Sequence, residues 1–223
     1  MERRADLPAL RDTGCLFITS AVESVDDRIL ALFDKRHTWH DVVRAVALLR
    51  GLGLALNPTF VAFTPWTSLA GYVEFLAAIR DLDLVDSVAP IQYAIRLLVP
   101  AGSRLLELPQ MRQIVGPFDA RALSYPWAHP DPRVDDLAAD VLAAVQDGQA
   151  QGQDRRAIFA TVWRMAHRTL RDGEGMGPAP FPPGSPRLPV PFAPGPSDLL
   201  STLAPGPPRP TAPITHLSEP WYC

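Results

Sequence analysis

Proline divides this sequence more sharply than any other residue type. Of its 25 prolines, 15 fall within residues 174–223, in runs such as residues 178–183 and 205–210. Each proline fixes φ, lacks a backbone donor and pushes its predecessor out of the α region, so helices and inner strands cannot continue through these runs. We therefore expect an extended, polyproline-like tail, with a packed fold ahead of it. The tail residues best suited to dock on that fold are Leu199, Leu200 and Leu203.

The composition of the whole chain is that of a globular protein. With 223 residues, 47% of them hydrophobic, the chain can bury one substantial core. A formal net charge of -3 provides no basic field, so neither nucleic acid nor a membrane is expected as a partner. No apolar run approaches the roughly 20 residues that cross a bilayer, and the first residues lack an apolar signal core, which favours a cytoplasmic location. Cys15 and Cys223 lie near opposite ends and do not indicate a disulfide framework.

Short apolar runs alternate with helical periodicity between residues 15 and 99. The runs predict strands at residues 15–18, 54–63 and 87–99, although Pro58 removes one ladder hydrogen bond from the second. Helical segments separate each strand from the next. Connections of this length are crossovers, so we expect parallel strands with right-handed connections in an α/β fold.

Capping residues indicate where the helices begin. Ser24 with Asp27, and Thr38 with Asp41, have the three-residue spacing of a capping box. Asp131 is followed by proline, which is favoured at the first helical position. Apolar residues at helical spacing predict helices over residues 29–33, 42–49, 69–79, 134–145 and 158–170.

Polar and aromatic side chains gather at the predicted carboxyl ends of the strands. Parallel α/β folds bind ligands at that edge, so these residues are candidates for binding. A carboxylate and hydroxyls can bond ribose hydroxyls, and a tryptophan offers a flat apolar surface for a ring. The structural alternative is that Ser24 only caps a helix and Glu23 is solvated. The candidates are Glu23, Ser24, Thr64, Trp66, Gln92 and Tyr93, with Arg96 beside the last two.

The histidines do not indicate a metal or catalytic site. His37 and His40 have a spacing that could place both on one helix face, but no nearby cysteine or acidic cluster completes a tetrahedral zinc set. No metal site is therefore predicted. His129, His167 and His216 are scattered, and neither a catalytic triad nor a glycine-rich phosphate loop can be recognised.

Four stretches, at residues 21–24, 34–38, 59–67 and 96–103, carry a family resemblance. They read Ala-Val-Glu-Ser, Asp-Lys-Arg-His-Thr, Thr-Phe-Val-Ala-Phe-Thr-Pro-Trp-Thr and Arg-Leu-Leu-Val-Pro-Ala-Gly-Ser. In this order they resemble the second half of the barrel of radical S-adenosylmethionine (SAM) enzymes. The resemblance is closest to a group named for its Cys-Cys-Ala-Glu-Pro or Cys-selenocysteine-Ala-Glu-Pro tail, and it extends to residues 218–223.

That resemblance implies a fold, a cofactor and a reaction. Residues 1–107 would form the C-terminal half of a parallel (β/α) partial barrel, residues 108–173 a helical extension and residues 174–223 the tail. Glu23 and Ser24 would face the SAM ribose, and the later strands would line the adenosine and substrate cavity. The whole enzyme would cleave SAM reductively with a [4Fe-4S] cluster and start radical chemistry on an unknown small-molecule or peptide substrate.

The chain departs from the family at the cluster. Three thiolates hold such a cluster, whereas this chain has two distant cysteines and lacks the glycine-rich segment that holds the SAM amino group. We therefore expect a fragment that binds no iron, is inactive alone and is completed by an N-terminal barrel half that would cover its open sheet edges. The alternative is a non-catalytic binding or scaffold protein that kept the half barrel and docks through its tail.

The resemblance also makes Cys223 a redox candidate. The chain stops where the family motif continues with cysteine or selenocysteine, which predicts a UGA codon read as selenocysteine. An adjacent selenol would be largely ionised at neutral pH, whereas a thiol with a pKa of about 8.5 is mostly protonated. A UAA or UAG codon after codon 223 would contradict this prediction and leave an ordinary chain end.

Overall fold

The computed structural model describes residues 6–174, with side chains to residue 172. The predicted tail, including Cys223, lies outside the described residues. Helices flank and connect the two strands as far as residue 81, and mostly helical structure follows. The elements are α1 (Leu7–Asp12), β1 (Phe17–Glu23), α2 (Asp27–Leu32), α3 (Trp39–Gly51), β2 (Ala55–Phe60), α4 (Leu69–Asp81), η2 (Pro90–Tyr93), η3 (Arg104–Glu107), α5 (Pro109–Ile114), α6 (Pro132–Ala150) and α7 (Arg155–Glu174).

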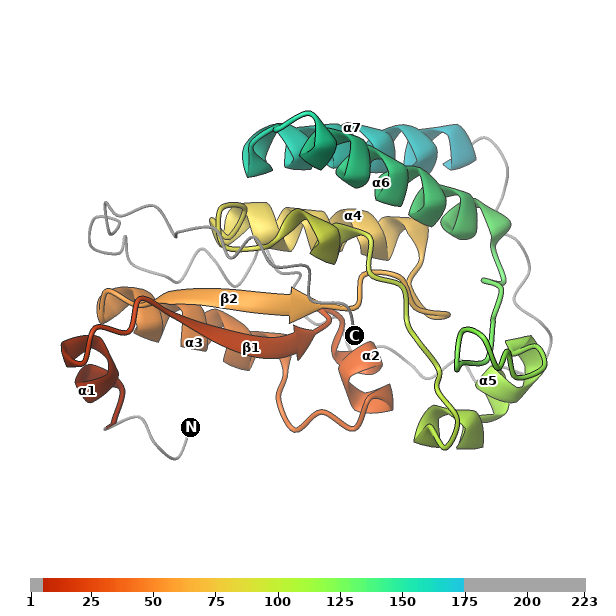
Figure 1. The fold of residues 1–223 in the computed structure, drawn as a ribbon, viewed down its shortest axis with the longest axis horizontal. Helices are drawn as coiled ribbons and strands as arrows, with labels where there is room; N and C mark the ends of the chain where they lie inside the picture. Colours follow the sequence, from red (N-terminus) through yellow and green to blue (C-terminus); the bar gives the residue numbers. More distant parts are fainter. Residues whose placement is uncertain (1–5, 175–223) are drawn as a thin grey trace.

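Strands β1 and β2 lie side by side and run parallel (Figure 1). Phe17 pairs with Ala55 and Ala21 pairs with Thr59, and the register shifts before Glu23. The parallel arrangement predicted from the long connection is confirmed. The first strand is longer than its apolar run predicted, because the polar residues that follow the run also pair with β2.

The two strands are buried to different degrees. In β2, buried residues from Leu56 to Phe60 alternate with half-buried ones, as in a strand with one face on a core. In β1, the central residues Thr19, Ser20 and Ala21 are all exposed. Among residues 6–174, β1 pairs with β2 and with no other strand, so its second edge is open.

The third predicted strand, over residues 87–99, is wrong. Pro90 begins the 3-10 helix η2 in this segment, because its fixed φ suits a first helical position and it has no N–H to offer a ladder. What remains of the predicted strand is an isolated parallel bridge between Phe63 and Arg96. The second strand likewise ends at Phe60, earlier than predicted.

The outer edge of β2 explains why no regular third strand forms there. The N–H groups of Ala55 and Val61 donate toward β1, so the nitrogen of Pro58, an odd number of residues away, falls on the opposite edge. A third strand would find no donor at that position. Two residues later, the Gln92 side chain accepts from the N–H of Phe60 at 2.7 Å. A side-chain amide thus takes the place of a strand.

Side-chain caps begin several helices, including three for which the sequence predicts a cap. Thr38 and Asp41 form the predicted capping box of α3, in which each side chain accepts from the other residue's N–H. Asp131 caps α6, as predicted. The predicted cap at Ser24 is wrong: Asp26 caps α2, because its carboxylate is the group placed to accept from the N–H of the second helical residue.

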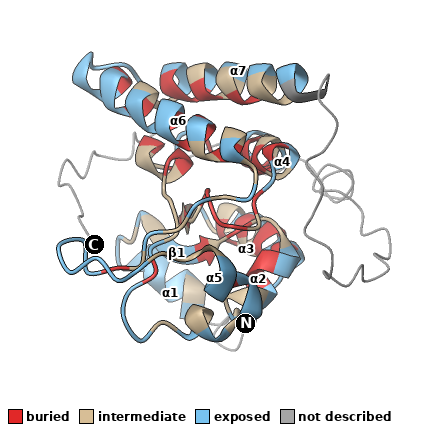
Figure 2. Cartoon of the chain, turned by 90° about the vertical axis from the view of Figure 1, so that its right-hand side faces the viewer, coloured by how far each residue is buried: buried red, intermediate tan, exposed pale blue. Residues whose placement is uncertain are grey.

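Helix α4 lies between the sheet and the α6–α7 hairpin (Figure 1). The faces of α3 and α4 that turn inward are buried, whereas the outer surface of α6 is exposed (Figure 2). Residues of β2, α3, α4, α6 and α7 form one apolar core, which spans the predicted domain boundary at residues 107 and 108; that boundary stays a prediction. None of the helices within residues 6–174 is long and apolar enough to cross a bilayer.

Candidate functional site

The carboxyl end of β1 is a tight turn centred on Glu23. The N–H of Ser24 donates to the carbonyl of Val22 at 3.0 Å, which closes a three-residue turn, and Glu23 has a φ of 72°. A positive φ is unfavourable for any residue with a Cβ atom and costs about 1–3 kcal/mol, and such conformations are common at binding sites. The backbone is thus strained at the residue that the sequence indicates for binding.

Two neighbours hold this turn. The Glu23 carboxylate accepts from the Lys35 ammonium at 2.9 Å, with side-chain exposed fractions of 22% and 27%. His37 Nε2 lies 3.2 Å from the Val22 carbonyl oxygen. Ser24 is buried, and its hydroxyl accepts from the backbone of the following turn. Glu23 is therefore ion-paired and partly shielded from water, which strengthens the attraction relative to a surface ion pair.

The loop after β2 forms the second part of the site. Thr64 is fully buried, and its hydroxyl lies 2.9 Å from the Thr67 hydroxyl and accepts from the Trp66 N–H at 3.2 Å. These bonds fold the loop on itself and leave Trp66 half-buried, with its ring edge-to-face against Phe33 at 6.2 Å. Phe33 directly precedes the α2–α3 loop, which also supplies Lys35 of the ion pair. This part of the chain therefore contacts residues at the ends of both strands.

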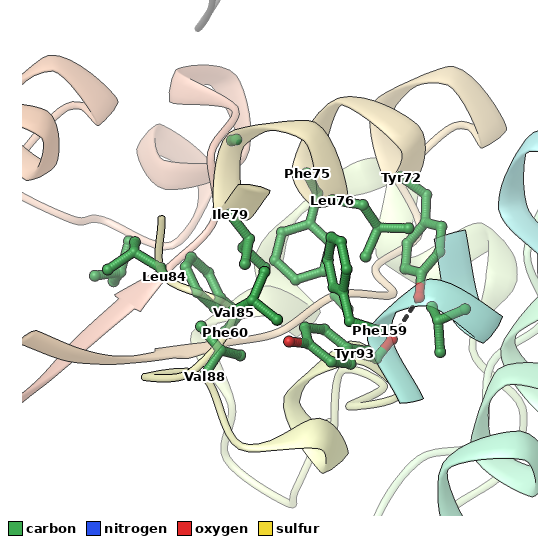
Figure 3. Packing of buried hydrophobic residues seen from close by; sticks show 14 of the residues in the cluster. Phe60, Tyr72, Phe75, Leu76, Ile79, Leu84, Val85, Val88, Tyr93 and Phe159 are labelled. Atoms are coloured by element: carbon green, nitrogen blue, oxygen red, sulfur yellow. Dashed lines mark hydrogen bonds between the residues drawn. The ribbon is translucent and has the colours of Figure 1, made fainter. Parts of the chain in front are cut away.

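Gln92 and Tyr93 have structural partners instead. The Gln92 amide oxygen accepts from Phe60, as described above. Tyr93 is completely buried; its ring meets Phe159 at 5.6 Å, and its carbonyl accepts from the Tyr72 hydroxyl at 2.8 Å (Figure 3). The Tyr93 hydroxyl has no hydrogen-bond partner among the described residues, and burial raises its pKa. A role for either residue in cofactor binding stays a prediction.

Arg96 lies in a network that sequence reasoning missed. Its guanidinium pairs with Asp135 at 2.6 Å, donates to the Trp127 carbonyl at 2.8 Å and lies 3.7 Å from the centre of the Trp127 ring. Asp135 also accepts from the N–H of His129 at 2.8 Å. These partners are more than 30 residues from Arg96 in the sequence, so no local spacing signals them. Lys35 was missed for the same reason, because it lies 12 residues after Glu23.

The residues present do not fit an iron-sulfur cluster. Within residues 6–174, no group of three or more His, Cys, Asp or Glu side chains is placed to hold a metal ion. His40 is exposed, and Cys15 is a half-buried free thiol that donates to a nearby carbonyl. The whole chain has two cysteines, whereas such a cluster needs three thiolates.

The strand-end residues do fit SAM. A carboxylate can accept from ribose hydroxyls, and a half-buried indole can cover a purine. Asn57 of β2 pairs in register with Thr19 of β1, and it lies on the half-buried face of β2, opposite Leu56 and Phe60. The Asn57 side-chain oxygen is buried without a hydrogen-bond partner among the described residues, which leaves an acceptor for a ligand.

The chain was compared with known proteins. No protein-family model matches it, and no curated protein matches it. A solved structure that is similar to it is that of the cobalamin-dependent S-adenosylmethionine radical enzyme OxsB with aqua-cobalamin bound, at a TM-score of 0.55 and 16% sequence identity. The match covers 66% of this chain and 26% of the OxsB chain. At this identity the likeness concerns the fold alone. The chain therefore shares the fold of part of a radical SAM enzyme.

Proposed function

We propose that this chain forms the C-terminal half of a radical SAM barrel and binds SAM at the carboxyl end of β1. The position and the backbone conformation of Glu23 carry the proposal. It belongs to the Glu-Ser pair that resembles the family, it occupies a strained backbone conformation, and it lies in a fold similar to part of OxsB. Strain of this kind persists only where the surrounding structure enforces it, which favours a binding role over a purely structural one.

The open edge of β1 supports an assembly with a second barrel half. An unpaired strand edge with exposed residues normally pairs with another strand or is covered. Thr19, Ser20 and Ala21 are exposed on this strand, and β1 pairs on one side within residues 6–174. The partner that we propose is an N-terminal barrel half, which would also supply the three thiolates that this chain lacks.

Four residues of the candidate site would then have defined roles toward SAM. The Glu23 carboxylate accepts from the ribose hydroxyls while Lys35 keeps it in place, and Trp66 covers the adenine ring. Asn57 offers its free side-chain oxygen from the face of β2 opposite Leu56 and Phe60. A second half that held the cluster would supply the electron for reductive cleavage of SAM, and the residues of this chain would hold the nucleoside while radical chemistry began on a small-molecule or peptide substrate. The finer assignment, to the group with the Cys-selenocysteine-Ala-Glu-Pro tail, depends on residues 218–223.

The test of the site is a titration of the full chain with SAM at millimolar concentration, followed by amide chemical shifts. We expect the shifts to concentrate at Glu23, Ser24 and Trp66. Glu23→Gln should weaken binding about tenfold to a hundredfold, the equivalent of one charge-assisted hydrogen bond of about 1.5–3 kcal/mol. Glu74→Gln, on the exposed face of α4, is the matched control. Shifts elsewhere, or binding that Glu23→Gln leaves unchanged, would overturn the proposal and favour a scaffold role.

A second experiment tests the missing half. Reconstitution of the chain with iron and sulfide under reducing conditions should give no four-iron absorption spectrum and no SAM cleavage. A stable cluster on this chain alone would contradict the division of roles between the two halves.

A further inference from the structure

A surface hollow of about 250 Å³ lies between two extended segments, residues 96–99 and 124–127. Tyr125 and Trp127 form one wall of this hollow. The Trp127 indole N–H donates to the Leu97 carbonyl across the hollow at 2.8 Å, which ties the two segments together. The hollow is therefore preformed and lined by aromatic rings, as in grooves that bind extended chains.

Exposed apolar side chains surround this hollow. Leu98 lines it and is 57% exposed, and Leu123, beside the lining residue Ser124, is 68% exposed. Phe118 is 40% exposed, and its ring lies 5.2 Å from that of Tyr125. Side chains of this size are usually covered when they gather on one surface. The patch formed by Leu98, Phe118, Leu123, Tyr125 and Trp127 is called the aromatic patch below.

The proline-rich tail begins on the same side of the molecule. Helices α6 and α7 have 19 and 20 residues and are joined by a short turn, so they run antiparallel and the end of α7 lies beside the start of α6 (Figure 1). The start of α6 at Pro132 is five residues after Trp127, a member of the aromatic patch. The last described residue, Glu174, therefore lies at the same end of the α6–α7 hairpin as the segment that contains Trp127.

The tail has the sequence pattern that such a patch recognises. Its prolines at 180, 183, 186 and 189 are spaced by three residues. A polyproline II helix has three residues per turn and rises about 3.1 Å per residue, so these prolines would form one continuous edge about 28 Å long. Proline edges of this kind dock on aromatic-lined grooves, because the chain is already extended and loses little conformational entropy on binding.

We propose that residues 180–189 of this chain dock on the aromatic patch in the polyproline II conformation. The five residues from 175 to 179 can span about 15 Å when extended, which provides a link between the end of α7 and the docked segment. The linker also holds the segment at a high effective concentration, so modest contacts are enough for binding. The docked segment would cover the exposed leucines and Phe118, and it would leave the strand-end site to SAM.

Disulfide trapping in the full chain tests this contact. In a background with Cys15→Ser and Cys223→Ser, one variant carries Leu98→Cys with Ser185→Cys. The matched control carries Leu142→Cys with Ser185→Cys, because Leu142 is an exposed leucine on α6 that is not part of the aromatic patch. Circular dichroism first checks that both variants fold. The rate of intramolecular disulfide formation under a mild oxidant is then measured at several protein concentrations.

We expect the Leu98 pair to form at least about tenfold faster than the Leu142 pair, at a rate independent of protein concentration. Changing Pro183, Pro186 and Pro189 to Ser should remove that advantage. Equal rates for the two pairs would overturn the proposal, as would an advantage that survives the proline changes. Cross-linked dimers that increase with concentration would also overturn it, since a second copy of the chain would then occupy the patch.

Discussion

Strands β1 and β2 are neighbours in one sheet, but they depend on different surroundings. β2 places Phe60 edge-to-face against Phe75 of α4 at 5.0 Å, and Gln92 closes its outer edge. β1 has one paired edge, exposed residues at its centre and a strained turn at Glu23. The helices of this chain therefore stabilise β2, whereas β1 carries the candidate site and an edge that is unpaired within residues 6–174. Substitutions in β2 should therefore mainly lower the stability of the fold, whereas substitutions at the end of β1 should mainly weaken binding.

The largest expected effect comes from the core side of this comparison. Phe60→Ala should lower the free energy of unfolding by about 3–5 kcal/mol, because it leaves a cavity beneath α4. Thr19→Ala, at an exposed position of β1, should change it by no more than about 0.5 kcal/mol. Urea unfolding of the full chain measures both values. Comparable losses would show that β1 is packed as firmly as β2.

The second prediction concerns the outer edge of β2, which the Gln92 side chain closes. Gln92→Ala should lower the free energy of unfolding by about 1–3 kcal/mol, because the N–H of Phe60 loses its acceptor in a partly buried place. Gln110→Ala, at an exposed position of α5, serves as the control and should be nearly neutral. Equal changes in the free energy of unfolding for the two variants would show that the Gln92 side chain does not close the outer edge of β2.

The third prediction separates strain from packing at Glu23. Glu23→Gly and Glu23→Ala both remove the ion pair with Lys35, but glycine accepts a φ of 72° without strain. The glycine variant should therefore be more stable than the alanine variant by about 1 kcal/mol. Both should bind SAM more weakly than the parent chain. An alanine variant as stable as the glycine variant would contradict strain at this turn.

The smallest expected effect extends the comparison to the loop before α6, which contains His129. Burial lowers the pKa of His129 below its usual 6.5. The unfolded chain then binds a proton more readily than the folded one, so the free energy of unfolding should fall as the pH drops from 6.5 toward the lowered value. His129→Gln should reduce this dependence, whereas Gln110→Ala, at an exposed position of α5, should leave it unchanged. Urea midpoints at pH 5 to 8 would decide, and an unchanged slope in His129→Gln would contradict the prediction.

The parts of the fold that could be predicted are those with local signals. The capping box of Thr38 and Asp41, the proline after Asp131 and the apolar period of α4 all act within a few residues, and all are confirmed. The apolar run at residues 87–99 predicts a strand wrongly, because a buried segment has the same apolar sequence pattern whether its backbone is extended or forms a turn. Pro90 was the local clue against a strand.

The candidate site was predictable to a similar extent. The rule for parallel sheets makes strand-end residues candidates for binding, and the structure places Glu23 at the end of β1 and Trp66 in the loop after β2. The partners of these residues were not predictable. Lys35 and the acceptor role of Gln92 depend on where separate segments meet in space, which spacing along the chain does not encode.

The parallel pairing of β1 with β2 also bears on how the chain folds. Phe17 pairs with Ala55, 38 positions further along, so a long loop must close before the first ladder bond can form. Helices form within about a microsecond, whereas such non-local pairing is slow. We therefore expect α3, with its capping box, to be present in the transition state. Weakening that cap should slow folding, and changes in β1 should mainly speed unfolding.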